Sequence, residues 1–416
     1  MPEQFAVGRN HASYPWLNRA IARVCTFLMA GIASFSMALN TYMDDFRATH
    51  LGAILVVLLS IHLAWHSRFT WRREFTIYAC LVGYMFVALL WTRDVELAMN
   101  TLVPATNCIL VMIFFGSLIT FHHVPSVLKG TLCGFMLSAA VFTLTQGFPF
   151  SYPENFSYNS IAGMYLFGLF ITLMYSCFTR SHVILLGIAV VIMLHIVATT
   201  SIKTNLGIAL GLVAAGIMYF RHFGRLLRRR LLLLIVLAGG LGFAVSSNDA
   251  LLERISHGVE RVTIGVKVLQ ARDDVAGYSA FEERDYWKQV GIEGWKQNPV
   301  FGYGTEAFRY DYGITSHSTP IDLLYNYGLI GLLLFYGVFA SLSWRLIQPA
   351  GKRVSNQRAL MFGGVICYLF MTLSGTLLYN SFLGAFVGIA AALLTSQGGA
   401  IVAPAVASGI RNAERR

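Results

Sequence analysis

The chain has 416 residues, of which 56% are hydrophobic and only 12% are charged, and its formal net charge is +11. Soluble domains carry about 25% charged residues, so this composition excludes an ordinary soluble protein and predicts an integral membrane protein. The long apolar runs do not alternate with polar residues, as the strands of a membrane barrel would. We therefore expect an all-α polytopic membrane protein, because a lipid-embedded helix satisfies its own backbone groups.

A membrane-spanning helix needs roughly 20 apolar residues, and about twelve such stretches occur along the chain. They cover approximately residues 17–39, 50–66, 75–91, 101–121, 127–146, 160–178, 182–199, 204–220, 230–247, 318–343, 359–375 and 381–397. Four parts follow from this pattern: spans one to nine in residues 1–246, a large loop in 247–317, spans ten to twelve in 318–397, and a tail in 398–416.

Lysine and arginine are distributed unequally between the two sets of loops. One set, which includes both termini, holds 20 of the 31 basic residues, whereas the short loops opposite hold only Arg47, Arg93 and Lys203. Basic loops stay on the cytoplasmic side, so both termini are predicted to be cytoplasmic and the large loop to face the other side. Because the charges are scattered, they indicate contact with anionic membrane lipids and argue against nucleic acid as a partner.

The large loop is predicted to contain two helices. Apolar residues recur every three or four positions over residues 251–269, which indicates an amphipathic helix at the membrane surface. Residues 271–279 are typical of a loop, and residues 281–297 are expected to form a second helix that ends before Asn298-Pro299. Charged residues, aromatic residues and glycines are then concentrated between residues 279 and 331, where any chemistry is most expected.

His317 is the candidate general base in that stretch. It begins the tenth span and follows the turn Gly302-Tyr303-Gly304, and an imidazole can accept a proton near neutral pH. The alternative is a structural histidine that caps or hydrogen-bonds at the membrane interface. His257, in the first loop helix, is the competing candidate and is expected to lie on a solvated face.

Three basic residues are candidate ligands of phosphate oxygens. Arg284 precedes Trp287 by three positions and offers a fork of donors, although it could equally form surface ion pairs. Lys203 lies in S-I-K-T-N at the start of the eighth span, where helix N–H groups also attract anions, although a snorkelling lysine is the alternative. Arg93 is the weaker candidate because Asp94 adjoins it.

No cofactor and no metal site is predicted. The sequence contains no Walker A, HExxH or nucleophile-elbow motif, and its six cysteines fall inside predicted spans without a CxxC pair. No cluster of ligand residues with metal-binding spacing is apparent in the sequence. Asp322 is the one carboxylate within a predicted span near His317.

The stretch N-P-V-F-G-Y-G-T-E-A-F, followed by H-S-T-P-I-D-L-L-Y-N-Y-G-L-I-G, resembles the signature of the O-antigen ligase and polymerase superfamily. The matching positions are Pro299, Gly302, Gly304, Phe308, His317, Gly328 and Gly331. Two positions depart from the family pattern. Ser318 stands where asparagine is frequent, and Lys203 stands where arginine is frequent.

The resemblance implies a GT-C-like glycosyltransferase in the bacterial inner membrane with its active site at the periplasmic face. The donor would be O-antigen linked to undecaprenyl diphosphate, and the acceptor would be lipid A–core. His317 would act as the base, while Arg284 and Lys203, together with Arg93, would hold the diphosphate during an inverting, metal-independent transfer.

Other activities stay open at the level of sequence. A polymerase or a protein O-oligosaccharyltransferase of the same superfamily would use the same residues. A flippase or transporter of lipid-linked glycan would bind the lipid phosphate with the same cations, with His317 as a gate. Transporters carry polar residues through the depth of several spans, whereas here the polar residues gather on one side, which favours an enzyme.

Overall fold

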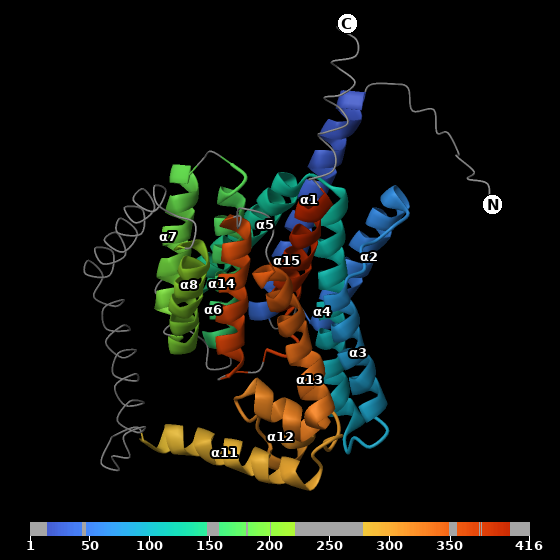
Figure 1. The fold of residues 1–416 in the computed structure, drawn as a ribbon, viewed down its shortest axis with the longest axis vertical. Helices are drawn as coiled ribbons and strands as arrows, with labels where there is room; N and C mark the ends of the chain where they lie inside the picture. The colour runs from blue at the N-terminus through green and yellow to red at the C-terminus, as the bar shows by residue number, and fades with distance from the viewer. Residues whose placement is uncertain are drawn as a thin grey trace, which may run out of the picture.

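The computed structural model describes residues 15–43, 47–147, 158–179, 182–199, 201–220, 278–348, 356–373, 375 and 377–399. Within these ranges all regular structure is helical, as the sequence predicts (Figure 1). The helices are α1 (Pro15–Tyr42), α2 (Ala48–His66), α3 (Arg73–Ala88), α4 (Val95–Phe121), α5 (Val124–Gln146), α6 (Tyr158–Ser176), α7 (His182–Ala198), α8 (Ile202–Phe220), α11 (Tyr278–Gln297), α12 (Ala307–Tyr312), α13 (Thr319–Ile347), α14 (Asn356–Thr372) and α15 (Ser381–Gly399).

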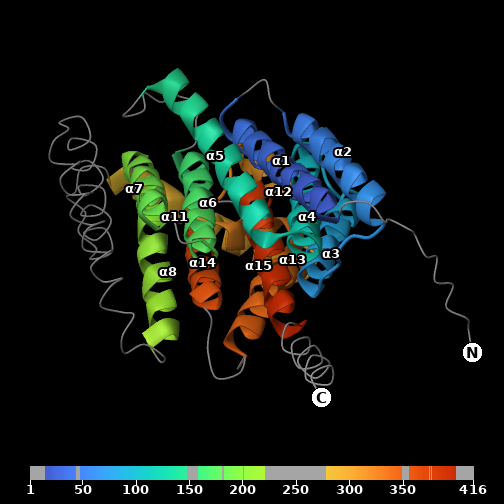
Figure 2. The same cartoon turned by 90° about the horizontal axis from the view of Figure 1, so that it is seen from above.

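Helices α1–α8 and α13–α15 form one bundle, and α11 and α12 lie across one of its ends (Figure 1). Figure 2 shows α7 and α8 at one side of the bundle, followed by α6 and α14 and then by α15. Helix α8 packs along α14, α1 along α5, and α4 along α15.

Many described helices are suited to a bilayer. Five are long and apolar enough to cross it, over Ala20–Tyr42, Ala48–His66, Val95–Phe121, Val124–Gln146 and Thr319–Ile347, and four shorter apolar helices accompany them. The chain is therefore a multi-pass membrane protein. Every predicted span except the ninth coincides with a described helix. The ninth span and the predicted surface helix at 251–269 lie outside the described residues. The number of twelve spans and the domain boundaries thus stay predictions.

Small residues allow α1 and α5 to pack closely. Gly130 and Gly134 are one turn apart on α5, and a side chain on either would collide with the α1 backbone, at the Phe27 and Gly31 carbonyls. Close backbone approach of this kind stabilises helix pairs in membranes, where burial of apolar side chains alone gives little net gain. The same contact continues to Tyr42, whose hydroxyl donates to the carbonyl of Ser138 at 3.0 Å.

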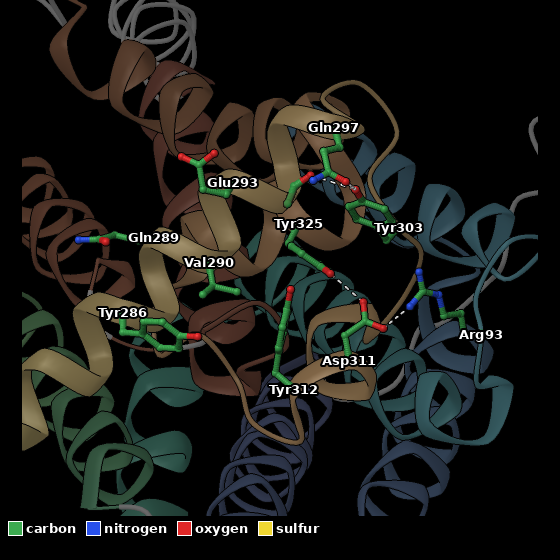
Figure 3. Close-up of a pocket in the computed structure, with 11 residues that line it drawn as sticks. Arg93, Tyr286, Gln289, Val290, Glu293, Gln297, Tyr303, Asp311, Tyr312 and Tyr325 are labelled. Atoms are coloured by element: carbon green, nitrogen blue, oxygen red, sulfur yellow. Dashed lines mark hydrogen bonds and ion pairs between the residues drawn. The ribbon is translucent and has the colours of Figure 1, made fainter.

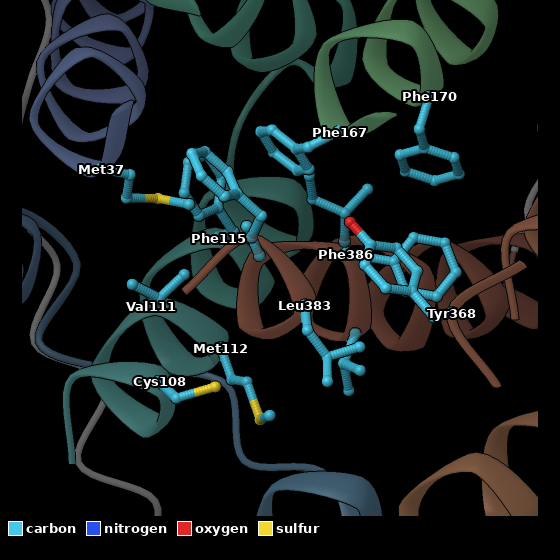
Figure 4. Close-up of a cluster of buried hydrophobic side chains, with 14 of the residues drawn as sticks. Met37, Cys108, Val111, Met112, Phe115, Phe167, Phe170, Tyr368, Leu383 and Phe386 are labelled. Atoms are coloured by element: carbon cyan, nitrogen blue, oxygen red, sulfur yellow. The ribbon is translucent and has the colours of Figure 1, made fainter. Parts of the chain in front are cut away.

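Aromatic rings fill the middle of the bundle where α6, α14 and α15 meet (Figure 4). The ring of Phe386 lies 4.7 Å from that of Phe170 and 5.0 Å from that of Tyr368, measured between centroids. Phe167 and Phe382 form a second pair at 5.4 Å. These spacings are typical of favourable aromatic pairs, and they fix α15 between α6 and α14.

A buried ion pair fastens the end of α13 that lies away from α11. The carboxylate of Glu74 on α3 is fully buried, and Nη1 of Arg345 lies 3.0 Å from both of its oxygens. The hydroxyl of Ser341 donates to the same carboxylate at 3.1 Å. A buried charge requires partners of this kind, so α3 and α13 are held in one register.

Helix α13 is interrupted at Gly328. Its φ of 62° and ψ of −160° are not helical, and a left-handed φ favours glycine because glycine has no Cβ. A side chain at this position would also collide with the carbonyl of Val300. The span predicted over residues 318–343 thus coincides with α13, and the structure adds an interruption at this position.

The glycine turn, residues 299–304, packs against this interruption and replaces the hydrogen bonds that the helix loses. The exchanged backbone bonds are Tyr303 N–H to Tyr325 O at 2.9 Å, Gly304 N–H to Asn326 O at 2.9 Å, Leu329 N–H to Pro299 O at 2.8 Å and Ile330 N–H to Val300 O at 3.4 Å. Buried backbone groups must find partners. The glycine turn and the broken helix therefore stabilise each other.

The first consequence is a stability difference between two glycine substitutions. Gly328→Ala should lower the melting temperature, since a left-handed backbone costs a residue with a Cβ about 1–2 kcal/mol and the collision with Val300 adds to this. Gly83→Ala is the matched control, because no atom lies within 4 Å of the added methyl group. We expect it to be neutral or stabilising by up to about 1 kcal/mol. Thermal unfolding in detergent, followed by tryptophan fluorescence, measures both, and equal melting temperatures would contradict the strain argument.

The second consequence concerns sidedness. We predict that α11 faces the periplasm and that the α2–α3 loop faces the cytoplasm, because the basic residues follow that division. Lys296→Cys and Arg68→Cys, both at exposed positions, would be introduced separately into a chain whose six natural cysteines are replaced by alanine. In cells with a permeabilised outer membrane, an impermeant maleimide should label the first variant only. Labelling of the second alone would reverse the orientation.

Candidate active site

His317 lies in a tight turn directly before α13. Its φ of 59° is left-handed, which is uncommon for a residue other than glycine. Its side chain is exposed, whereas Ser316 and Ser318 on either side are buried. The Ser316 hydroxyl donates to the Ser318 carbonyl at 3.0 Å, and the Ser316 N–H donates to Oδ1 of Asp322 at 3.0 Å. The buried Asp322 carboxylate thus fixes the backbone that carries the imidazole ring.

Gly375, in the loop between α14 and α15, contacts both Lys203 and the start of α13. Lys203 lies in the first turn of α8, and its Nζ occupies the space that a side chain on Gly375 would need. Thr319, two residues after His317, donates its hydroxyl proton to the Gly375 carbonyl and accepts the N–H of Leu377 at 3.0 Å. The start of α8 and the start of α13 therefore meet at Gly375.

Arg284 completes this group from α11. It is exposed, it is the nearby charge with the strongest effect on His317, and it also repels Lys203. Helix α11 packs closely against the start of α13 because Gly291 has no side chain and leaves room for the side chain of Ile321. Lys203, Arg284 and His317, which the sequence predicts as site residues, thus form one cation–histidine group at this end of the bundle.

The surroundings of His317 favour its neutral form. Although the residue is exposed overall, the protein desolvates part of its ring, which lowers its pKa from the ordinary value of 6.5, and the positive charge of Arg284 lowers it further. Lys203 adds to this effect, while the carboxylates of Asp322 and Glu283 oppose it. An imidazole with a lowered pKa is largely unprotonated at pH 7, so it can accept a proton from a substrate.

Arg93 lies in a neighbouring cleft instead. This cleft has a volume of about 580 Å³ and runs along the flank of α11 (Figure 3). Arg93 forms an ion pair with Asp311, whose second oxygen accepts a hydrogen bond of 2.7 Å from the Tyr325 hydroxyl. Among the described residues, Arg93 is not one of the charges that shift the pKa of His317. Its predicted contact with a diphosphate therefore stays a prediction.

The same cleft is rich in aromatic and polar side chains. Tyrosines and amides supply most of its wall, together with the ion pair: Tyr286, Gln289, Gln297, Tyr303, Tyr312 and Tyr325. Figure 3 shows side chains of α11 on one side of the cleft and Asp311 and Tyr312 on the other. Flat rings with hydrogen-bonding groups suit a polar ligand with apolar faces.

Glu306 is a buried carboxyl that the sequence did not reveal as a site residue. It follows the glycine turn with a left-handed φ of 59°, and Oε1 accepts a hydrogen bond of 2.7 Å from the Thr101 hydroxyl. Burial raises its pKa, and the nearby Asp322 carboxylate adds to this, against the opposing effects of Thr101 and Arg309. The only signal in the sequence was an acid within the otherwise uncharged segment T-E-A-F.

The fold and the site define a multi-pass helical membrane protein with a cation–histidine group at one end of its bundle. Residues 187–336 match the family model described as O-antigen ligase. This is the family that the signature residues predicted, and the match covers residues 187–336 of the 416 in the chain. No curated protein matches the chain. The matched region contains Lys203, Arg284, His317 and Gly328 but not Arg93, and it makes glycosyl transfer the general class of reaction.

The charges around His317 predict a measurable pH dependence. Transfer should fail as the pH drops through the lowered pKa of His317, because the protonated ring cannot accept a proton. Arg284→Gln removes a positive neighbour and should move the acid limb of kcat/KM to higher pH. Glu283→Gln removes an opposing negative charge and should move the limb to lower pH. Identical acid limbs for the wild type and both variants would show that another group controls the rate.

Proposed function

We propose that this protein is an O-antigen ligase, which transfers a glycan from undecaprenyl diphosphate to a hydroxyl group of lipid A–core at the periplasmic face of the bacterial inner membrane. One observation carries the proposal: Lys203 from α8, Arg284 from α11 and His317 at the start of α13 come together within the region that matches the family. The position of this group at the end of a membrane bundle suits a donor whose polyprenyl tail stays in the lipid.

The proposed reaction is a single displacement. The acceptor hydroxyl oxygen attacks C1 of the first donor sugar, and its proton passes to a ring nitrogen of His317. The bond between C1 and the diphosphate oxygen breaks, and its electron pair leaves with the diphosphate. Arg284 and Lys203 stabilise the negative charge that develops there, which is the usual task of cations at a leaving group. Attack from the face opposite the diphosphate inverts the configuration at C1, and no step requires a metal.

The neighbouring cleft supports the proposal because it offers room for sugars beside the reacting groups. Tyr286, which lines the cleft, is two residues from Arg284 on α11. Because positions two apart point to different faces of a helix, a glycan in the cleft would pass around α11 to reach the cation–histidine group. This arrangement suits a reaction between two large substrates, of which one is anchored through its diphosphate.

Product identity tests the proposal. Purified protein in detergent would be incubated with undecaprenyl-diphosphate glycan, with and without lipid A–core, and the products analysed by mass spectrometry. A conjugate of glycan and lipid A–core is the expected result. Longer lipid-linked glycans without added acceptor would instead identify a polymerase. Movement of the donor across liposomes without any new glycosidic bond would overturn the enzyme proposal.

Removal of the base should abolish transfer without unfolding the protein. We expect His317→Ala to lose about 10² to 10⁴ of the transfer rate, the usual effect of a missing general base, while its melting temperature and donor binding stay near those of the wild type. His257→Ala is the control, because it removes the other histidine predicted in the large loop. Substantial turnover by His317→Ala, or equal loss in His257→Ala, would refute the assignment.

Removal of the Lys203 charge should weaken use of the donor selectively. A lost charge-assisted hydrogen bond costs roughly 1.5–3 kcal/mol, so Lys203→Ala should raise the donor KM or reduce kcat/KM for the donor about ten- to a hundredfold. Lys203→Arg should retain much of the activity because the charge is kept. Steady-state kinetics with each substrate varied in turn would separate the two effects. An unchanged donor dependence in Lys203→Ala would exclude Lys203 from the diphosphate site.

A further inference from the structure

Three histidines meet at the end of the bundle opposite the cation–histidine group. His62 and His66 are one turn apart in the last turns of α2, and His122 directly follows α4. Helix α4 begins next to the loop of Arg93 and runs away from α11, so its last residues lie at the far end (Figure 1). One ring nitrogen of each histidine lies within 4.8 Å of those of the other two.

The hydrogen bonds of His122 are compatible with its being a metal ligand. The Thr26 hydroxyl lies 2.6 Å from the carbonyl of Ala22 and 2.7 Å from Nδ1 of His122. In the tautomer that carries its proton on Nδ1, His122 donates to the Thr26 oxygen, and the unprotonated Nε2 faces Nδ1 of His62 at 3.3 Å.

This arrangement has the form of a metal site. Zinc lies about 2.0–2.1 Å from a histidine nitrogen, and two such ligands at tetrahedral angles are about 3.3 Å apart, which is the distance between His62 Nδ1 and His122 Nε2. A second hydrogen bond on the opposite ring nitrogen, such as the one that Thr26 receives, is the usual support of a metal-binding histidine.

A purely hydrogen-bonded cluster explains the arrangement less completely. A proton on His62 Nδ1 would link His62 to His122, but among the described residues Nε2 of His62 and Nε2 of His66 are both buried without a hydrogen-bond partner. Leaving a buried polar atom unpaired is costly. A metal ion bound by Nε2 of His66, Nδ1 of His62 and Nε2 of His122 would satisfy one of these two atoms, while Phe121, stacked on His66 at 5.7 Å, holds the ring in place.

We propose that His62, His66 and His122 bind one divalent transition-metal ion, zinc in the first instance, which joins the end of α2 to the end of α4. Three imidazoles are a ligand set that zinc accepts, with the fourth position open to water or to a further ligand. His62 is fully buried, whereas His66 and His122 are partly exposed, so an ion can enter from that side. This site is separate from the transfer reaction and is independent of the proposed ligase activity.

Metal binding by the purified full-length chain tests the proposal. The protein would be isolated in detergent with a tag that contains no histidine, stripped with a chelator and titrated with zinc against a fluorescent competitor. One zinc per chain is expected, and Co²⁺ in its place should give the intense visible bands of a tetrahedral site. His66→Phe keeps a ring at the position but removes the ligand, and it should weaken zinc binding at least tenfold.

Two further variants separate metal binding from general damage. Thr26→Val leaves all three ligands intact but removes the acceptor for His122, and it should weaken zinc binding roughly ten- to a hundredfold. His123→Ala, at the adjacent histidine, should bind zinc like the wild type. Zinc should also raise the melting temperature of the wild type and of His123→Ala but not that of His66→Phe. The absence of stoichiometric zinc in the wild type, or equal affinity in His66→Phe, would show a hydrogen-bonded cluster only and overturn the proposal.

Discussion

The exchange of backbone hydrogen bonds between the glycine turn and the interruption of α13 is the constraint on which the site depends. A spanning helix cannot leave backbone groups unpaired inside the membrane or inside a protein core. Here Gly328 opens the helix, and the segment from Pro299 to Gly304 supplies the missing partners. The same contact sets the course of the chain through Glu306 and α12 to His317. Most of the signature residues therefore serve the contact between the glycine turn and the interruption of α13, whereas His317 lies outside it.

The junction places His317, directly before α13, at one end of the helical bundle (Figure 1). His317 is displayed by a strained turn that Asp322 and two serines hold from inside, while the cations arrive from two other helices. Because Lys203 and Arg284 repel each other and also disfavour a proton on His317, an incoming dianionic group would relieve the unfavourable contacts among all three. In the proposed function, this mutual repulsion would favour binding of a diphosphate, which is a general means of using binding energy.

The amino-acid sequence alone predicts those features that depend on the order of apolar and charged residues along the chain. Apolar runs located the described helices to within a few residues, and charge together with the signature predicted Lys203, Arg284 and His317, which the structure places at one end of the bundle. Features that depend on contacts between distant segments could not be obtained in this way. Nothing near Arg93 indicates that Asp311 neutralises it, and Glu306 is isolated in the sequence. His62 and His66 are four residues apart, a spacing that also occurs in metal sites, but they lie in an apolar span. The third histidine of the cluster, His122, comes from the end of another helix.

The rigid position of α11 bears on the size of the substrates in the proposed reaction. It carries Arg284 near one end and, nine positions further on, Glu293 in the wall of the cleft. At 1.5 Å per residue these two positions are about 14 Å apart along the axis, and the contacts of Gly291 and Gly294 with α13 prevent the helix from sliding. Under the proposed function, a sugar chain in the cleft would lie along a helix that cannot shift relative to Arg284 and the diphosphate. The length of the sugar chain, and not only its chemical identity, would then affect which substrates react.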